Sequence, residues 1–315
     1  MAINDLATAA KYTGELDKVI VQEAVTGFMA DNTFRSKFVG AKTVIVPDMD
    51  MVGLADYDRD DGYAQGGITV KQTSFELTKD RGRKLVLDRE DMDETGIANL
   101  AGQVLGEFAR TKVVPEMDAY VLSKLAKIAA SESVAQDEDG NSVNTKTKHT
   151  AVFNSSKPMA QFNTVADSIR SRAGFNTELV AFVHPTFYTA LKNTTEFQKT
   201  VVISDFKQGE INLKVKSIDG ITLIPVAADR MKSEYNFTSD NSSKVGFTPT
   251  EGAVDNYLIM LPKKACSLVK KTETMRIFTP EQNKDRDAYE FNYRLYYDCF
   301  VKKSDLEYIE TVTSA

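Results

Sequence analysis

Charged residues of both signs gather at positions 81–94, around a short apolar run at 85–87. The basic members are Arg81, Arg83, Lys84 and Arg89, and the acidic members are Asp88, Glu90, Asp91, Asp93 and Glu94. Such a cluster could bind nucleic acid, hold a metal through its carboxylates, perform acid–base chemistry, or form ion pairs within the chain or with a second copy of it. The rest of the sequence decides among these kinds of site.

A second acidic stretch, DYDRDDG, has the spacing of a calcium site only in part. An EF-hand loop needs oxygen ligands at its first, third and fifth positions, glycine at the sixth and a bidentate glutamate at the twelfth. Asp56, Asp58 and Asp60 fit the first three positions, but Asp61 takes the place of the glycine and Gly67 that of the glutamate. We therefore expect a solvated acidic loop and no metal site.

The sequence shows no recognisable catalytic or cofactor-binding motif. GxSxG, GxxxxGK(S/T) and GxGxxG are all absent, which disfavours nucleophile-elbow hydrolases, P-loop proteins and dinucleotide binders. His149 and His184 have no partner at metal-ligand spacing, and the ring of His184, beside Pro185, can bind backbone groups instead. We predict no catalytic centre, no cofactor and no metal.

Composition indicates a globular protein that folds in a cytoplasm. The net charge of −6 and the pI of about 5.2 disfavour a general nucleic-acid binder, which usually has a basic surplus. Cys266 and Cys299 are too few for a disulfide framework, so we expect reduced, packed thiols. The N-terminal stretch MAINDLATAAKYTGELDK lacks the pattern of a secretory signal, and no stretch approaches the ~18 apolar residues of a membrane span.

The pattern at 42–88 predicts an antiparallel β-excursion with a long polar tip. Within it, apolar alternation changes phase, which predicts a bulge or a twist between 71 and 74. The expected order is a strand at 42–48 ended by Pro47, an exposed connection at 49–67, a strand at 68–78, a turn at 80–82 and a strand at 84–88.

The strongest helical pattern follows this excursion. Apolar residues spaced by three and four run from Ile97 to Ile128, and Thr95 or Asp93 can cap the start. Pro115 lies within the run, removes one backbone hydrogen bond and should kink the helix. We predict a long, bent, amphipathic helix, followed at 131–157 by an exposed polar insert or loop.

Residues 158–262 predict a compact unit of helices on a central sheet. A helix begins near Pro158 and ends at Gly174. Continuous apolar runs are typical of strands covered on both faces, and they occur at 178–185, 220–227 and 256–262.

The two ends of the chain carry weaker signals. Residues 267–278 predict a further strand, and 288–310 alternate with a period of two, although that run also fits a helix. Near the N-terminus, apolar residues between Leu16 and Phe28 have helical spacing. This short stripe could cover its own domain or bind a neighbour.

The two-sign cluster is better suited to contacts between subunits than to stabilising one subunit. Exposed ion pairs contribute only about 0–1 kcal/mol each. Charges beside a strand keep its open edge soluble and still permit pairing with a complementary surface, and a weak contact is reinforced when it repeats in a symmetric assembly. A solvated face at the foot of a helix is the simpler alternative.

The order of these elements is similar to a known family. The segments that carry the likeness are FELTKDRGRKLVLDREDMDETGIANLAGQVLGEFARTKVVPEMDAYVLSKLA (75–126), GITLIPVAADRM (220–231) and RIFTPEQNKDRDAYEFNYRLYYDCFV (276–301). Together they resemble the major capsid proteins of tailed bacteriophages, the Hong Kong 97-type fold, whose relatives include encapsulin nanocompartments. The resemblance depends on the combined order of the segments.

The resemblance implies an α+β fold in which residues 68–90 form one long bent strand. It also implies five parts: an N-terminal arm (1–40), an extended β-hairpin E-loop with its base strands (41–93), a P-domain with a long spine helix and the polar insert (94–157), an α/β A-domain (158–262), and a C-terminal segment that returns through the A-domain to the P-domain (263–315).

The same resemblance implies a function in the virion. The subunits would form hexamers and pentamers of an icosahedral shell, assembled in the host cytoplasm, that encloses double-stranded DNA without reading its sequence. The segment before the E-loop is too short for a scaffolding domain, so a separate scaffolding protein is expected, together with a portal protein. An encapsulin-like shell and an unrelated α/β enzyme remain the alternatives.

Under this mapping the two-sign cluster and the acidic stretch DYDRDDG both have places in the shell. The two-sign cluster lies at the foot of the E-loop, where subunits meet, and its candidates for intersubunit contact are Arg81, Arg83, Lys84, Asp88, Arg89 and Asp91. The tip of the E-loop carries Asp56, Asp58, Asp60 and Asp61.

Overall fold

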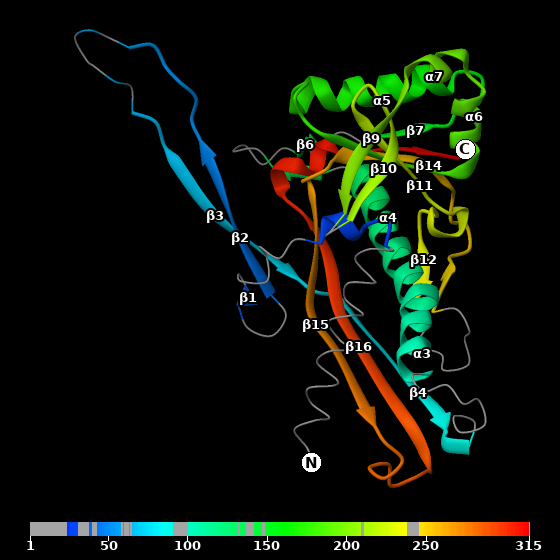
Figure 1. Ribbon diagram of the computed structural model, residues 1–315. Coiled ribbons are helices and arrows are strands. Elements are labelled where there is room, and N and C mark those ends of the chain that lie inside the picture. Colours follow the sequence, from blue (N-terminus) through cyan, green and yellow to red (C-terminus); the bar gives the residue numbers. More distant parts are fainter. Residues whose placement is uncertain are drawn as a thin grey trace.

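The computed structural model describes residues 24–30, 38–39, 43–57, 59, 63, 65–90, 100–131, 133–136, 142–146, 149–208, 211–237 and 246–314. A body of sheets and helices carries a two-stranded arm that projects away from it (Figure 1). Within the described part of the chain, no helix is long and apolar enough to cross a membrane.

The arm is a small sheet of order β1–β2–β3, formed by β1 (Phe38–Val39), β2 (Thr43–Met51) and β3 (Ile68–Glu76). β2 and β3 pair without a register shift over their whole length, so the bulge alternative at 71–74 is wrong and the twist stays a prediction. The predicted end at Pro47 is also wrong, because this residue pairs with Gln72 inside β2. β1 pairs only with the start of β2, and a proline fits where its nitrogen can face an unpaired edge.

The arm joins the body through β4 (Lys79–Asp88), an edge strand of a three-stranded sheet of order β15–β16–β4. β4 is continuous, so the turn predicted at 80–82 is wrong. A Cβ at Gly82 would lie 3.0 Å from the carbonyl oxygen of Tyr293, so this glycine permits close approach of β16. Only Leu77 and Thr78 separate β3 from β4, which is close to the bent strand that the resemblance implies.

The long helix has one interruption. α3 (Leu100–Phe108) leads into a π-helical turn, η3 (Ala109–Val113), and then into α4 (Val114–Ala130). Pro115 lies in the first turn of α4, where a missing N–H is tolerated. A π-helical turn therefore interrupts the helix shortly before the proline, and the kink predicted at Pro115 stays a prediction. The predicted start at Ile97 and its caps lie outside the described residues.

A seven-stranded sheet forms the centre of the body, in the order β7–β17–β14–β8–β11–β10–β9. Its central strand β8 is buried along its whole length, parallel to β11 and antiparallel to β14. The buried strands predicted from apolar runs are thus confirmed. The members are β7 (Thr150–Val152), β8 (Leu179–Val183), β9 (Val201–Gln208), β10 (Ile211–Ile218), β11 (Ile221–Pro225), β14 (Asn256–Pro262) and β17 (Glu310–Thr313).

Helices cover both faces of this sheet. Ala181 and Val183 of β8 pack toward α5 and α6, whereas Val180 and Phe182 pack toward α4. α5 ends before Gly174, whose φ is 87°, so the predicted stop is confirmed. The covering helices on the first face are α5 (Pro158–Ala173), α6 (Pro185–Lys192) and α7 (Thr195–Thr200).

The polar insert is more structured than an exposed loop. It contains a hairpin of β5 (Ser133–Gln136) and β6 (Ser142–Lys146), and then β7, which pairs with β17 at the edge of the large sheet. The expectation of a loop fails because this pairing partner lies about 160 positions later in the chain. The smaller elements are η1 (Gly27–Met29), η4 (Ala228–Arg230), β12 (Tyr235–Phe237), β13 (Phe247–Pro249) and η5 (Lys303–Tyr308).

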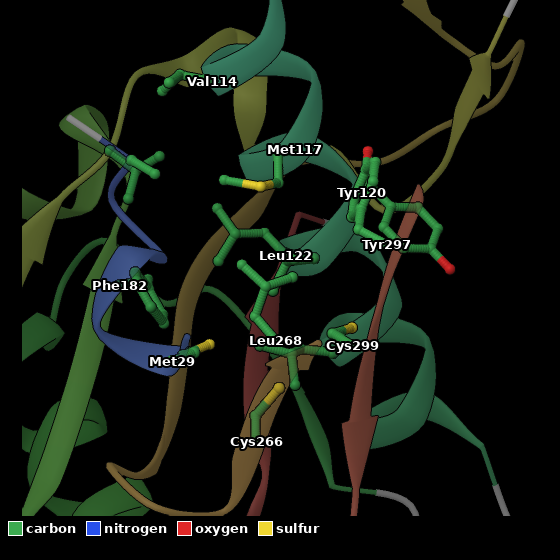
Figure 2. Packing of buried hydrophobic residues seen from close by; sticks show 14 of the residues in the cluster. Met29, Val114, Met117, Tyr120, Leu122, Phe182, Cys266, Leu268, Tyr297 and Cys299 are labelled. Carbon is green, nitrogen blue, oxygen red and sulfur yellow. The ribbon is translucent and has the colours of Figure 1, made fainter. Parts of the chain in front are cut away.

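Two long antiparallel strands, β15 (Cys266–Phe278) and β16 (Ala288–Val301), form the lower body. The alternating run is therefore a strand as far as Val301, and a short helical turn, η5, follows it. The largest apolar core lies where these strands, α4 and the large sheet meet. Figure 2 shows Met117 and Leu122 of α4 in the same cluster as Leu268, with both cysteines nearby. Both cysteines are free and buried, as predicted.

Candidate assembly interface

The arm exposes an unusual amount of apolar surface. Leu54 and Tyr63 near its end are 106% and 91% exposed, and Ile68 at the start of β3 is 69% exposed. We call the following residues the apolar blade: Met51, Val52, Leu54, Tyr57, Tyr63, Ile68 and Val70. Soluble chains expose single apolar residues routinely, but several large ones on one short arm indicate a surface that binds another macromolecule.

The geometry of the arm explains why its own chain leaves the blade bare. A two-stranded ribbon has two faces and no layer to cover either of them, and such a ribbon is at best marginally stable alone. The arm extends to the upper left of Figure 1, away from the body. Tyr57 and Tyr63 make one local contact, edge to face, with ring centroids 4.9 Å apart. The described part of the chain thus leaves the blade exposed.

The two-sign cluster lies on β4, where the strand period divides it between two faces. Exposure alternates along β4: Arg81 and Arg83 are half-buried, and Lys84 and Asp88 are exposed. Side chains of successive strand residues point to opposite faces. The cluster is therefore two separate sets of charges.

Arg81 is bound inside its own chain. Its Nε donates to Oε1 of Glu116 at 2.6 Å, and one terminal nitrogen donates to Oε2 of Glu116 at 3.2 Å and to the carbonyl oxygen of Gly246 at 3.0 Å. This fork-shaped pair is the geometry in which guanidinium binds carboxylate most strongly. Arg81 thus connects β4, α4 and the segment before β13.

The exposed members of the cluster have weaker partners in the chain. Lys84 forms a salt bridge with Glu290 of β16. The hydrogen bond that the Lys84 ammonium donates in this pair lowers the pKa of Glu290. Nη1 of Arg89 lies 3.8 Å from Oδ1 of Asp287. Oδ1 of Asp88 accepts a hydrogen bond from the backbone N–H of Glu90. Asp91 lies outside the described residues. None of these contacts tests an intersubunit role, which stays a prediction for Arg81, Arg83, Lys84, Asp88 and Arg89.

Among the described residues, neither the acidic tip nor the histidines form a metal site. Asp56 is exposed, and Asp58, Asp60 and Asp61 lie outside the described residues. His184 accepts a hydrogen bond from the N–H of Thr186 at 3.2 Å and caps α6, which confirms that its ring serves the backbone. Across the described ranges, no group of three potential ligand side chains could hold a metal.

Sequence reasoning missed two fully buried carboxylates, Asp118 on α4 and Asp298 on β16. Burial raises the pKa of Asp118, although hydrogen bonds from Thr26 and the charge of Arg230 oppose the shift. The available signal was an acidic residue inside an apolar run, as in the stretch YYDCF. A buried charge is costly unless it is bound, so both positions mark places where several segments converge.

Comparison with known proteins gives structural matches only. No protein-family model and no curated protein matches the chain. The mature capsid of bacteriophage PhiM1 matches with a TM-score of 0.56 and 13% identity, over 87% of this chain and 82% of that one. The capsid of cyanophage P-SCSP1u matches with a TM-score of 0.56 and 12% identity, over 89% and 85%. A Mycobacterium phage Che8 chain matches with a TM-score of 0.54 and 9% identity, over 92% and 90%.

These matches establish the fold. The chain has the Hong Kong 97-type fold of tailed-phage capsid proteins, over nearly its whole length. The α+β class predicted from the sequence is confirmed. Identities this low carry no information on function by themselves, so the function must be argued from the site.

Proposed function

We propose that this chain is the major capsid protein of a tailed bacteriophage, a structural protein and not an enzyme. Copies assemble into hexamers and pentamers of an icosahedral shell that encloses double-stranded DNA. A separate scaffolding protein and a portal protein complete the assembly, which takes place in the host cytoplasm and ends in the virion. The five parts implied by the resemblance describe how each subunit is divided.

The observation that carries the proposal is the bare apolar blade on an arm that projects from a body of capsid fold. Covering Leu54, Ile68 and Val70 against a neighbouring copy would contribute on the order of 5 kcal/mol per contact. A second copy is the partner that the fold favours, because closed symmetric assembly repeats one contact in every subunit. The net charge of −6 suits a wall that encloses DNA without adhering to it.

Electron microscopy of the purified protein tests the proposal. We expect shells, or rings of five or six subunits, from wild-type protein expressed with the scaffolding gene that accompanies it. Ile68→Lys should abolish these particles, because it places a charge in the middle of the blade. Val254→Lys, at a body residue that is 37% exposed, is the matched control and should assemble normally.

Two outcomes would contradict the proposal. One is a folded protein that stays a single subunit at high concentration with the scaffold present, and the other is normal assembly of Ile68→Lys. The contents of the particles separate the alternatives that share this fold. Particles that enclose a protein cargo and no DNA would assign the chain to the encapsulin-like shells.

A further inference from the structure

The direction of the arm is set at a two-residue break. Leu77 and Thr78 lie between β3, which belongs to the arm sheet, and β4, which belongs to the body sheet. A break with free backbone groups would act as a flexible hinge, since unbonded segments open most easily. Two backbone groups of this break, the N–H of Thr78 and the carbonyl oxygen of Leu77, are instead hydrogen-bonded to side chains of β16.

Asp298 binds Thr78 through its carboxylate. One carboxylate oxygen, Oδ2, accepts from the backbone N–H of Thr78 at 3.0 Å and from its hydroxyl at 2.8 Å. The other, Oδ1, accepts from the hydroxyl of Tyr120 at 2.8 Å, from the ammonium of Lys124, and from the N–H of Cys299 at 2.7 Å. One side chain of β16 therefore connects the break to α4.

The residue before Thr78 is held as firmly. The carbonyl oxygen of Leu77 accepts from the hydroxyl of Tyr296 at 3.0 Å. Its side chain is 4% exposed and packs in a small apolar cluster of the arm and the body. That cluster contains Val44, Leu77, Val269, Tyr296 and Phe300, with Phe75 packed against it. Arm strands β2 and β3 thus share a core with β15 and β16.

Leu77, Thr78 and the apolar cluster around Leu77 form the root of the arm, and this root differs from the apolar blade in its packing. The root buries its apolar side chains and binds the N–H and hydroxyl of Thr78 and the carbonyl oxygen of Leu77, whereas the blade leaves its apolar side chains exposed. We propose that Asp298 is a positioning residue that fixes the direction of the arm in the free subunit, through Thr78. Only the use of that direction, to meet a neighbouring copy, rests on the proposed function.

A carboxylate suits this role better than an apolar residue. Burying the Asp298–Lys124 pair costs desolvation energy that the pair attraction repays only in part. Packed apolar residues would give similar stability, but they tolerate several arrangements. A carboxylate with five donors around it accepts only one arrangement of the segments that carry them. Asp298 therefore favours one arm direction.

Distance measurement by electron spin resonance tests the inference on the unassembled subunit. One nitroxide label replaces Ile68 on the arm, and the other replaces Phe175 on the body, which is 77% exposed. Cys266 and Cys299 are buried and should not react. We expect a single narrow distance distribution in the otherwise wild-type protein.

Variants at Thr78 separate positioning from general stability. Thr78→Val keeps the shape but removes the hydroxyl donor, and losing one hydrogen bond to a charged acceptor should raise the population of displaced arms about ten-fold. Thr78→Ser keeps the hydroxyl and should restore the narrow distribution. Thr248→Val, at an exposed position of β13, is the matched control and should leave the distribution unchanged.

Hydrogen exchange gives a second readout. In Asp298→Asn the amide of Thr78 loses its charged acceptor, and its exchange should accelerate about ten-fold, while amides of β8 keep their protection. If Asp298→Asn does not fold, the Thr78 pair alone carries the test. An unchanged distance distribution in Thr78→Val, or equal broadening in Thr78→Val and Thr78→Ser, would overturn the inference.

The two proposals fail in different ways. A fixed arm in a protein that never forms particles would refute the capsid function and leave the role of Asp298 standing. A freely moving arm in a protein that forms normal shells would refute the role of Asp298 alone. Both measurements use the same purified chain.

Discussion

Asp118 connects the first described segment of the chain to the long helix. Its carboxylate is fully buried and accepts from the N–H of Val25 at 3.2 Å, from the N–H and hydroxyl of Thr26 at 3.0 and 2.7 Å, and from Arg230 at 3.1 Å. Three segments that lie far apart in sequence meet at this one side chain. Asp118→Ala should therefore release the segment at 24–30.

The size of the effect follows from the donors left behind. An unsatisfied buried donor costs about 1–3 kcal/mol, and breaking a buried charge pair by removing one partner costs about 3–5 kcal/mol. Burial raises the pKa of Asp118, so the cost of desolvating this carboxylate offsets part of the stability that its hydrogen bonds contribute. We expect a loss of about 3–5 kcal/mol in the free energy of unfolding. Thr26→Ser, which keeps the hydroxyl donor, should lose much less.

Urea denaturation and hydrogen exchange measure this loss. The midpoint of unfolding should fall in Asp118→Ala, and the amides at 24–30 should exchange faster than those of β8. A midpoint within error of wild type, with unchanged exchange at 24–30, would refute the reasoning. It would show that Asp118 is not what binds this segment.

The pH dependence gives the same prediction a sign. A carboxyl whose pKa is raised by folding binds more protons in the folded state, so its contribution to stability falls as pH rises from its unfolded value of 3.8 through the folded pKa. Asp118→Asn cannot titrate. Its deficit relative to wild type should thus be larger at about pH 4 than at about pH 7, and a deficit that grows with pH would contradict this account.

Three further predictions concern the charges around β4. Gly246→Ala should cost about 1–3 kcal/mol, because its Cβ would lie 2.3 Å from Oε2 of Glu116; in a Glu116→Ala background, urea melts should show little further loss. Lys84→Met should raise the pKa of Glu290 toward 4.5, which carbon NMR can measure. The stability that the variant loses relative to wild type should shrink as pH falls through the lowered pKa of Glu290. An unchanged pKa of Glu290 would exclude the ion pair. Arg83→Glu combined with Lys84→Glu should block particle formation in electron micrographs, and normal shells would remove the intersubunit role of these residues.

Much of the secondary structure was predictable because its signals are local. The apolar runs of β8, β11 and β14 indicated buried strands, and those strands lie in the covered sheet. The helix that begins at Pro158 and stops at Gly174 depends on the conformations of those residues themselves. Local backbone preferences and periodicity act within a few residues, so the sequence displays them directly.

The errors arose where a partner strand overrides local preference. Pro47 ends a strand on local rules, yet it lies within β2 because one edge of that strand is unpaired there among the described residues. Gly82 indicates a turn, yet it lies within a strand because β16 approaches it closely. The polar insert reads as a loop, yet part of it pairs with β17. In each case the deciding residue is distant in the chain.

The sequence by itself determined the order and type of the main elements and, through that order, the resemblance to a capsid fold. Only the tertiary structure decided which charges are committed inside the subunit. The sequence does not show what Arg81 or Asp298 binds, because the partners lie far along the chain; Thr78 and Asp298, for example, are 220 positions apart. The physical reason is that periodicity is a property of neighbours in sequence, whereas the burial and pairing of a charge depend on neighbours in space.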